Sequence, residues 1–275
     1  MRRFRSCSRL VTLVVGFAAL ASAQNLSAPK GHLVIVGGGG VPDAVASRAI
    51  ALSGGRSAVV AVFPQASELK ETGAESVDFW TKAGAARAVE VTLSDRAAAV
   101  DALKAATFIW FPGGDQNRLT EALKGTGLPE LIRQRYASGT TVGGTSAGAA
   151  VMSAVMITGD ADLQSITAGK TKTAGGFGLL PGAIVDQHFQ KRQRMNRLIS
   201  AVLDHPRLVG IGVDEKTAII VSEGRRFEVI GDSSVVVIDA RRARANPAAD
   251  GALAAGTGLN LHILKPGMSF DLAAR

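Results

Sequence analysis

Cysteine is nearly absent from this sequence. Cys7 is the single cysteine among 275 residues, and it lies in front of an apolar run that is typical of an export signal. Removal of such a signal leaves a chain with no cysteine at all. That composition excludes disulfide bonds, thiolate nucleophiles and cysteine ligands to a metal.

Motifs that bind nucleotides or metals are missing as well. No Walker A segment occurs, and Gly37–Gly40 does not continue into a dinucleotide fingerprint, because Pro42 stands where that motif requires its last glycine. No cluster of histidine, aspartate and glutamate has the spacing of metal ligands. We therefore expect no cofactor and no metal, so any catalysis must depend on the side chains of the chain itself.

The first 23 residues predict a signal peptide. An apolar run, Leu10–Leu20, leads to the small-residue cleavage site Ala21-Ser22-Ala23, and the basic residues in front of the run are Arg2, Arg3, Arg5 and Arg9. An uncleaved membrane anchor is the competing interpretation, but the run is too short to span a bilayer comfortably. We expect export to the periplasm or beyond, by the Sec or the twin-arginine route.

Cleavage after residue 23 also changes the charge balance. It removes those four arginines from a formal net charge of +8, which takes away most of the case for a nucleic acid partner. We expect no nucleic acid binding and no stable membrane association of the mature chain. A homodimer is compatible with the sequence. Residues 24–275 are enough for a substantial core in one domain.

Apolar runs alternate with helical patterns through the first half of the chain. This alternation is typical of the α/β class, in which helices cover both faces of a parallel sheet. The predicted strands are His32–Val36, Ala58–Phe63, Ala88–Leu93, Thr107–Phe111 and Thr140–Gly143, and the predicted helices are Asp43–Ser53, Glu68–Ala83 and Asp95–Ala105. Ligands bind at the carboxyl ends of such strands, where Gly37–Gly40 and Gly113-Gly114-Asp115-Gln116 lie.

The pattern changes after Leu208 to short extended runs with turns between them. We expect these runs to add antiparallel strands to the sheet edge; they are Leu208–Val213, Ala218–Ser222, Arg226–Ile230 and Ser234–Asp239. Asn246–Gly258 is rich in alanine and glycine and predicts a loop, and Leu259–Leu264 predicts a last strand.

Ser146 is the first catalytic candidate. It lies in Gly144-Thr145-Ser146-Ala147-Gly148, which has the G-x-S-x-G spacing of a nucleophile elbow between a strand and a helix. The sharp turn exposes the serine, and the N–H of Ala147 is free to stabilise an oxyanion. The alternative is a glycine-rich turn that happens to contain serine.

A serine nucleophile needs a general base, and His188 is the best placed of four histidines. It follows the apolar run Gly182–Val185, whereas the other three lie at a strand start, in a His-Pro turn and in a late strand, namely His32, His205 and His262. A structural, hydrogen-bonded histidine is the alternative. The base in turn needs a carboxylate, and Asp214 and Glu215 follow the strand Leu208–Val213.

Three arginines follow His188 on a helix predicted over Arg192–Leu203. Guanidinium groups bind carboxylates through two parallel hydrogen bonds, so Arg192, Arg194 and Arg197 favour an acidic substrate. The alternative is a solvated basic face of an ordinary helix.

Taken together, these segments resemble cyanophycinases, in the family that also holds the aspartyl dipeptidases (peptidase E). The resemblance covers nearly all of the mature chain and rests on Phe111–Gln116, Gly143–Ser153, Asp186–Phe189 with the three arginines, and Gly210–Glu215. It implies a class-I-glutamine-amidotransferase-like, flavodoxin-like sheet and a metal-free serine hydrolase. Ser146 then matches the nucleophile, His188 the base and Glu215, rather than Asp214, the acid.

The resemblance also implies the remaining site residues and the substrate. Gly114 and Ala147 match the oxyanion hole, and the positions that match the substrate pocket are Gln116, Asp186, Gln187, Arg192, Arg194 and Arg197. Cyanophycin, a polyaspartate with arginine on its side chains, is the implied substrate and β-Asp-Arg the implied product. An aspartyl dipeptidase is the alternative, although such enzymes generally end soon after the acid. A non-catalytic protein that binds anionic peptides is a more distant one.

Overall fold

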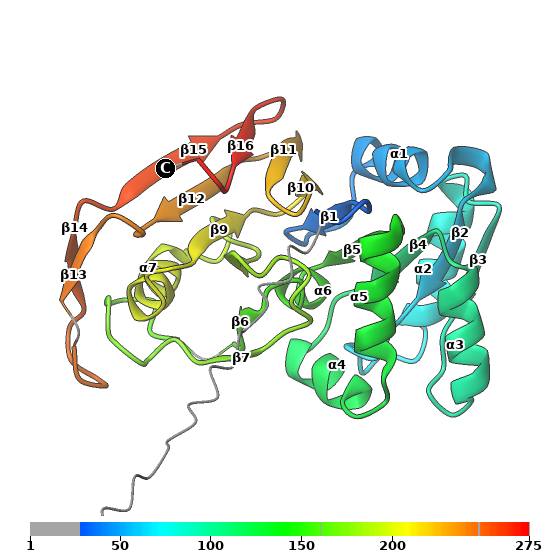
Figure 1. Ribbon diagram of the computed structural model, residues 1–275, viewed down its shortest axis with the longest axis horizontal. Helices are drawn as coiled ribbons and strands as arrows, with labels where there is room; N and C mark the ends of the chain where they lie inside the picture. The colour runs from blue at the N-terminus through cyan, green and yellow to red at the C-terminus, as the bar shows by residue number, and fades with distance from the viewer. Residues whose placement is uncertain (1–27, 160, 247, 275) are drawn as a thin grey trace, which may run out of the picture.

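The computed structural model describes residues 28–159, 161–246 and 248–274 (Figure 1). The predicted signal peptide, residues 1–23, lies outside these ranges. Within them, no helix is long and apolar enough to cross a membrane.

Five parallel strands form most of the main sheet and reach one of its edges. They are β1 (Leu33–Val36), β2 (Val59–Val62), β3 (Arg87–Glu90), β4 (Phe108–Phe111) and β5 (Thr141–Thr145). The helices between them are α1 (Asp43–Leu52), a 3-10 turn (Gly55–Ser57), α2 (Thr72–Lys82), α3 (Arg96–Ala105), α4 (Gln116–Leu123) and α5 (Leu128–Ser138). The predicted α/β class with a parallel sheet is confirmed.

Helices cover both faces of this sheet, which explains the nearly continuous apolar strands. Leu33 packs into the cluster that includes α3 and α5, whereas its neighbour Val34 packs into the cluster that includes α1 and α2 (Figure 1). On the second face Trp80 of α2 packs edge-on against Phe108 and Trp110, with ring centroids 4.8 Å apart in both pairs.

The C-terminal strands divide between two sheets. The antiparallel strands β10 (Thr217–Ser222), β11 (Arg226–Gly231) and β16 (Ser269–Asp271) extend the main sheet beside β1, in the order β16-β11-β10-β1-β5-β4-β2-β3. A second sheet has the order β15-β12-β9-β8, formed by Asn260–Leu264, Val235–Asp239, Val209–Val213 and Ala183–Asp186.

The second sheet corrects the expectation that every late strand joins the main sheet edge as an antiparallel strand. β9 pairs with β8 in parallel, because α7 (Met195–Asp204) connects the two strands as a crossover and packs on them. β12 lies antiparallel on the other side of β9. Two adjacent apolar runs therefore enter different sheets, a distinction that depends on pairing partners distant in the sequence.

Several boundaries also differ from the predictions. The helix expected from Glu68 begins only at Thr72, since the Ser67 hydroxyl bonds the N–H of Leu69 and the Thr72 hydroxyl and holds residues 68–71 as a loop. The loop expected over 246–258 contains β14 (Ala255–Thr257), paired with β13 (Arg244–Asn246). The hairpin of β6 (Val155–Ile157) and β7 (Thr173–Gly175) was not predicted.

Candidate active site

Ser146 lies in a sharp turn between β5 and α6 (Ala147–Ala150), with φ 54° and ψ −111°. Its flanking glycines are required by close backbone approach. A β-carbon on Gly144 would lie 2.4 Å from the Gly148 carbonyl oxygen, and one on Gly148 would lie 2.0 Å from the Phe111 carbonyl oxygen. The N–H of Ser146 donates to the Val36 carbonyl at 3.1 Å. Ser146 therefore lies in the strained turn that the G-x-S-x-G spacing predicts.

Ser146, His188 and Glu215 form one hydrogen-bonded chain. The Ser146 Oγ lies 3.0 Å from the His188 Nε2, and the His188 Nδ1 lies 2.6 Å from the Glu215 Oε1. Each residue follows the carboxyl end of a strand: β5, β8 and β9 respectively. The side chains of His188 and Glu215 are 10% and 27% exposed. The arrangement allows His188 to take the proton of the serine hydroxyl while the carboxylate fixes the tautomer of the ring.

Asp214, the neighbouring acid, has a different set of contacts. Its carboxylate accepts hydrogen bonds from the backbone N–H of Gln190 and Lys191, at 3.1 and 3.0 Å, and from the Ser233 hydroxyl at 2.9 Å. It thus holds the segment that follows His188, whereas the contact to the imidazole comes from Glu215.

The glycine run after β1 is a part of the site that sequence reasoning missed. A β-carbon on Gly38 would lie 2.3 Å from the His188 ring, and one on Gly39 would lie 2.8 Å from the Glu215 Oε2. The Gly37 carbonyl accepts the His188 N–H at 2.7 Å, and the Gly38 carbonyl accepts the Lys216 N–H at 2.8 Å. The glycines were visible as a loop at a strand end, but they were tested only as a nucleotide motif.

Burial of the ring lowers the pKa of His188 below its ordinary value, and the positive charges of Arg192 and Arg194 act in the same direction. The hydrogen bond and charge of Glu215 raise the pKa but do not reverse the shift. His188 is therefore neutral at pH 7, the state that a general base requires.

Gly113 and Gly114, which follow β4, have separate surroundings. A β-carbon on Gly113 would lie 3.5 Å from the Ser146 Cβ, so this glycine flanks Ser146. Gly114 has φ 138° and packs on the next loop, where a β-carbon would lie 2.1 Å from the Ala66 carbonyl oxygen. Ala147, the other expected donor, is fully buried at the first position of α6, which follows β5.

The three arginines differ in what they contact. Arg197 pairs with the fully buried carboxylate of Asp186 through its Nε at 2.8 Å and through its Nη2. Arg194 donates from Nη1 to the Gln187 carbonyl and side-chain oxygens at 2.7 and 2.9 Å, and the same nitrogen lies 3.7 Å from Asp186. Arg192 is exposed, and its backbone N–H donates to the His188 carbonyl at 2.9 Å.

The helix predicted over Arg192–Leu203 is wrong at its start, and of the three arginines only Arg197 lies within the observed helix. α7 begins at Met195, because His188 and Gln193 adopt positive φ, at 47° and 54°, and the chain turns twice before the helix. Burial lowers the pKa of Arg194 to about 10, with the charge of Arg197 contributing by repulsion, yet the Arg194 guanidinium stays charged at pH 7.

Gln116, the first residue of α4, is the remaining residue expected to bind substrate. Its side-chain nitrogen donates to the carbonyls of Ile157 and Thr158 at 2.9 and 2.6 Å, which fixes the end of β6, and Arg197 donates to Gly159 at 3.3 Å. Of the residues expected to bind substrate, Gln116, Arg194 and Arg197 thus already have protein partners for their polar groups.

A serine held against a histidine and a carboxylate, on a mainly parallel α/β sheet, is the architecture of a serine hydrolase. Residues 33–229 match the model of Peptidase family S51, and the chain therefore belongs to that family of serine peptidases.

Several relatives and solved structures are similar to this chain. A cyanophycinase of Trichormus variabilis is 36% identical over 252 residues, which are 86% of this chain and 85% of the relative. A cyanophycinase of Geminocystis herdmanii is 40% identical over 194 residues, 68% and 71% of the two chains. The crystal structure of a peptidase from an acI-B1 Actinobacterium matches with a TM-score of 0.64 at 24% identity, over 89% of this chain and 98% of that one. A putative peptidase E from Listeria monocytogenes matches with a TM-score of 0.51 at 18% identity, over 74% and 98%.

Proposed function

We propose that this protein is a serine-type cyanophycinase, which cuts the polyaspartate backbone and releases β-Asp-Arg dipeptides. The observation that carries the proposal is the hydrogen-bonded chain from the Ser146 Oγ through His188 to Glu215. The substrate class is supported by relatives named cyanophycinase at 35–40% identity.

The reaction proceeds in two halves. His188 takes the proton of Ser146 while the Oγ attacks the scissile carbonyl, and the N–H groups of Ala147 and Gly114 stabilise the oxyanion. His188 then gives its proton to the leaving amine, and an acyl-enzyme remains. Water hydrolyses this ester with His188 again as the base, while the Glu215 carboxylate balances the imidazolium charge in both halves.

Arg192 has the central part in recognition of the substrate. Each unit of cyanophycin carries a free arginine carboxylate, and the guanidinium of Arg192 is the exposed one of the three beside His188. Arg194 donates a hydrogen bond from one nitrogen to Gln187, and Arg197 forms an ion pair with Asp186. These two arginines act mainly by fixing the wall of the pocket.

The alternative in the same class is an aspartyl dipeptidase that acts on Asp-X or isoaspartyl peptides. The same nucleophile and base would serve it, so the choice depends on the substrate. Incubation of residues 24–275 with insoluble cyanophycin, and separately with Asp-X and β-Asp-X dipeptides, distinguishes the two, with products identified by mass. Release of β-Asp-Arg by the parent and not by Ser146→Ala supports the proposal, whereas turnover of dipeptides alone contradicts it.

Export of the mature chain belongs to this proposal as well. The basic, apolar and small-residue order of residues 1–23 supports it, and an exported enzyme would act on polymer outside the cell's interior. N-terminal sequencing of protein from the periplasm and the medium tests it. A mature chain that begins at Gln24 is the expected result.

A further inference from the structure

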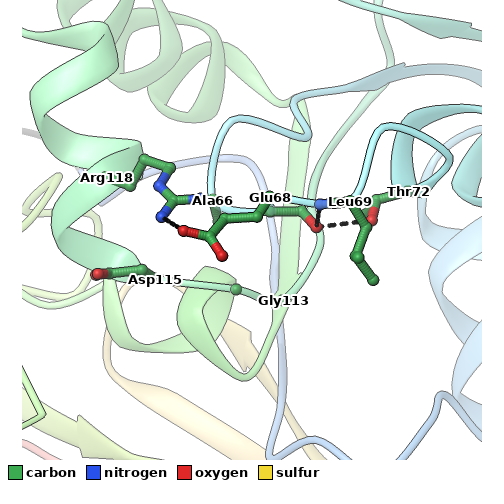
Figure 2. A pocket seen from close by; sticks show the side chains of 9 residues that line it. Ala66, Glu68, Leu69, Thr72, Gly113, Asp115 and Arg118 are labelled. Atoms are coloured by element: carbon green, nitrogen blue, oxygen red, sulfur yellow. Dashed lines mark hydrogen bonds and ion pairs between the residues drawn. The ribbon is translucent and has the colours of Figure 1, made fainter.

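A cavity of about 620 Å³ opens between the loop after β2 and the loop after β4 (Figure 2). This volume falls within the range of small-molecule sites, roughly 300–1,000 Å³. Gly113 lines the cavity, and it is also the glycine that flanks Ser146. The cavity therefore begins at the glycine next to the nucleophile and extends to residues 66–72, which follow β2.

The cavity is distinct from the network of Arg192, Arg194 and Gln187. In the main sheet β5, which ends directly before Ser146, lies between β1 and β4. His188 contacts the loop after β1, whereas the cavity is formed by the loops after β4 and β2. A peptide bound across Ser146 thus has His188, with Arg192 and Arg194 near it, on one side and this cavity on the other.

Charges of both signs face the cavity. Figure 2 shows Arg118 of α4 reaching across to the carboxylate of Glu68, with which it forms an ion pair. Their side chains are 38% and 78% exposed, so the pair is weak and separates at little cost. Asp115 adds a second carboxylate to the lining, and it also caps α4 through the N–H of Asn117 at 2.7 Å.

We propose that this cavity is a subsite for a second arginine-bearing unit of the polymer, in which Arg118 binds the arginine carboxylate and Glu68 binds the guanidinium. The proposal rests on the cyanophycin substrate proposed above. A β-linked arginine presents one carboxylate and one guanidinium. Its carboxylate takes the place of Glu68 beside Arg118, and its guanidinium takes the place of Arg118 beside Glu68. The excess carboxylate of Asp115 favours a ligand that carries the guanidinium.

The subsite gives a reason for preferring polymer to dipeptide. A dipeptide that fills the arginine network leaves the cavity empty, whereas an oligomer fills both sides of Ser146. We therefore expect Glu68 and Arg118 to affect KM for oligomers and to have little effect on dipeptides. A role confined to holding the loop would affect both substrates alike.

The test measures binding without turnover. In the Ser146→Ala background, calorimetry gives Kd for a soluble oligomer of three β-Asp-Arg units, for its citrulline analogue and for its arginine-amidated analogue. Citrulline keeps the shape of arginine without the charge, and amidation removes the carboxylate. Each analogue is combined with Glu68→Gln and with Arg118→Gln in a double-mutant cycle. Lys124→Gln is the matched control, because Lys124, directly after α4, forms an ion pair with Glu121 of that helix and lies outside the cavity.

We expect Glu68→Gln or citrulline alone to weaken binding roughly 5- to 10-fold, the range between an exposed ion pair and a charge-assisted hydrogen bond. The two changes together weaken it little further, and the same holds for Arg118→Gln with amidation. Lys124→Gln leaves Kd unchanged. Additive losses in both cycles overturn the subsite while the parent still cuts the polymer. A parent that releases no β-Asp-Arg from polymer or oligomer overturns the proposed function itself.

Discussion

Gly38 lies directly against His188, so close that a β-carbon on the glycine would be 2.3 Å from the ring. The same residue has φ 107° and accepts the N–H of Lys216, which follows Glu215. One glycine thus leaves room for the imidazole and, through its carbonyl, anchors the strand end that carries the carboxylate. The position of the His188 ring therefore depends on the lack of a side chain at Gly38.

Gly38→Ala is expected to displace the His188 ring and lower kcat about 100-fold, since a shift of about 1 Å in a catalytic group costs that much. Gly40→Ala is the matched control: its φ is 99°, yet its β-carbon would meet nothing within 4 Å. Both variants should lose about 1–2 kcal/mol of stability from the positive φ. Steady-state kinetics and thermal unfolding separate the effects, and equal kcat values for the two variants would contradict the role of Gly38.

Local spacing was enough to predict some features of the site and not others. The elbow at Ser146 is encoded by two glycines within five residues, so its strained turn could be predicted. The hydrogen bond of Glu215 to His188 joins strand ends that meet only after β8 and β9 pair. The sequence left Asp214 and Glu215 as alternatives, and only the family resemblance favoured Glu215.

The predictions for the arginines and for the C-terminal strands were wrong for the same physical reason. The predicted helix began at Arg192, but the positive φ of Gln193 interrupts it and depends on contacts that a helical pattern does not reveal. The buried carboxylate that Arg197 neutralises was read only as a pocket residue. Likewise, β9 and β10 look alike as apolar runs, and their assignment to different sheets depends on distant partners.

Ser146→Ala is expected to abolish peptide hydrolysis while it leaves folding and substrate binding largely intact. The hydroxyl is needed only for the covalent step, and loss of a nucleophile in such a triad costs on the order of 10⁶-fold in turnover. Product release measured beside calorimetric binding of an oligomer checks both parts. A variant that keeps more than about a tenth of the activity rules out the acyl-enzyme.

Glu215→Gln is expected to lower kcat, whereas Asp214→Asn is expected to lower stability. Glu215→Gln should lower kcat by about 10⁴-fold with little change in Tm, because the amide no longer balances the imidazolium. Asp214→Asn should cost about 1–3 kcal/mol of stability, since its carboxylate accepts three hydrogen bonds around the His188 segment. Kinetics and denaturant unfolding of both variants test this. A larger kcat loss for Asp214→Asn would move the acid to that residue.

Arg197→Met is expected to destabilise the fold by about 3–5 kcal/mol, because it leaves the fully buried Asp186 carboxylate without its main partner. Arg192→Gln, at an exposed position, should leave stability unchanged and raise KM for arginine-bearing substrates. Urea unfolding and KM measured for both variants distinguish a structural arginine from one that binds substrate. Should Arg197→Met unfold at the same urea concentration as the parent, the Asp186 pair is not the support we assign to it.

The pH dependence of kcat/KM should show an acid limb whose midpoint lies below 6.5, the ordinary pKa of histidine, because burial and the nearby arginines lower the pKa of His188. Only neutral His188 accepts the serine proton, so activity is lost as the pH falls through that pKa. The same shift makes the folded protein less stable in acid, since the unfolded chain takes up the proton more readily.

Arg192→Gln removes one positive charge that lowers this pKa, so its acid limb should move to higher pH. Lys191→Gln serves as the control, because Lys191 is the exposed neighbour of Arg192 and is not among the groups that shift His188. The profiles are measured at low and constant ionic strength, since salt screens an exposed charge. An acid limb that moves to lower pH in Arg192→Gln, or that moves equally in Lys191→Gln, would show that the charge of Arg192 does not control the protonation of His188.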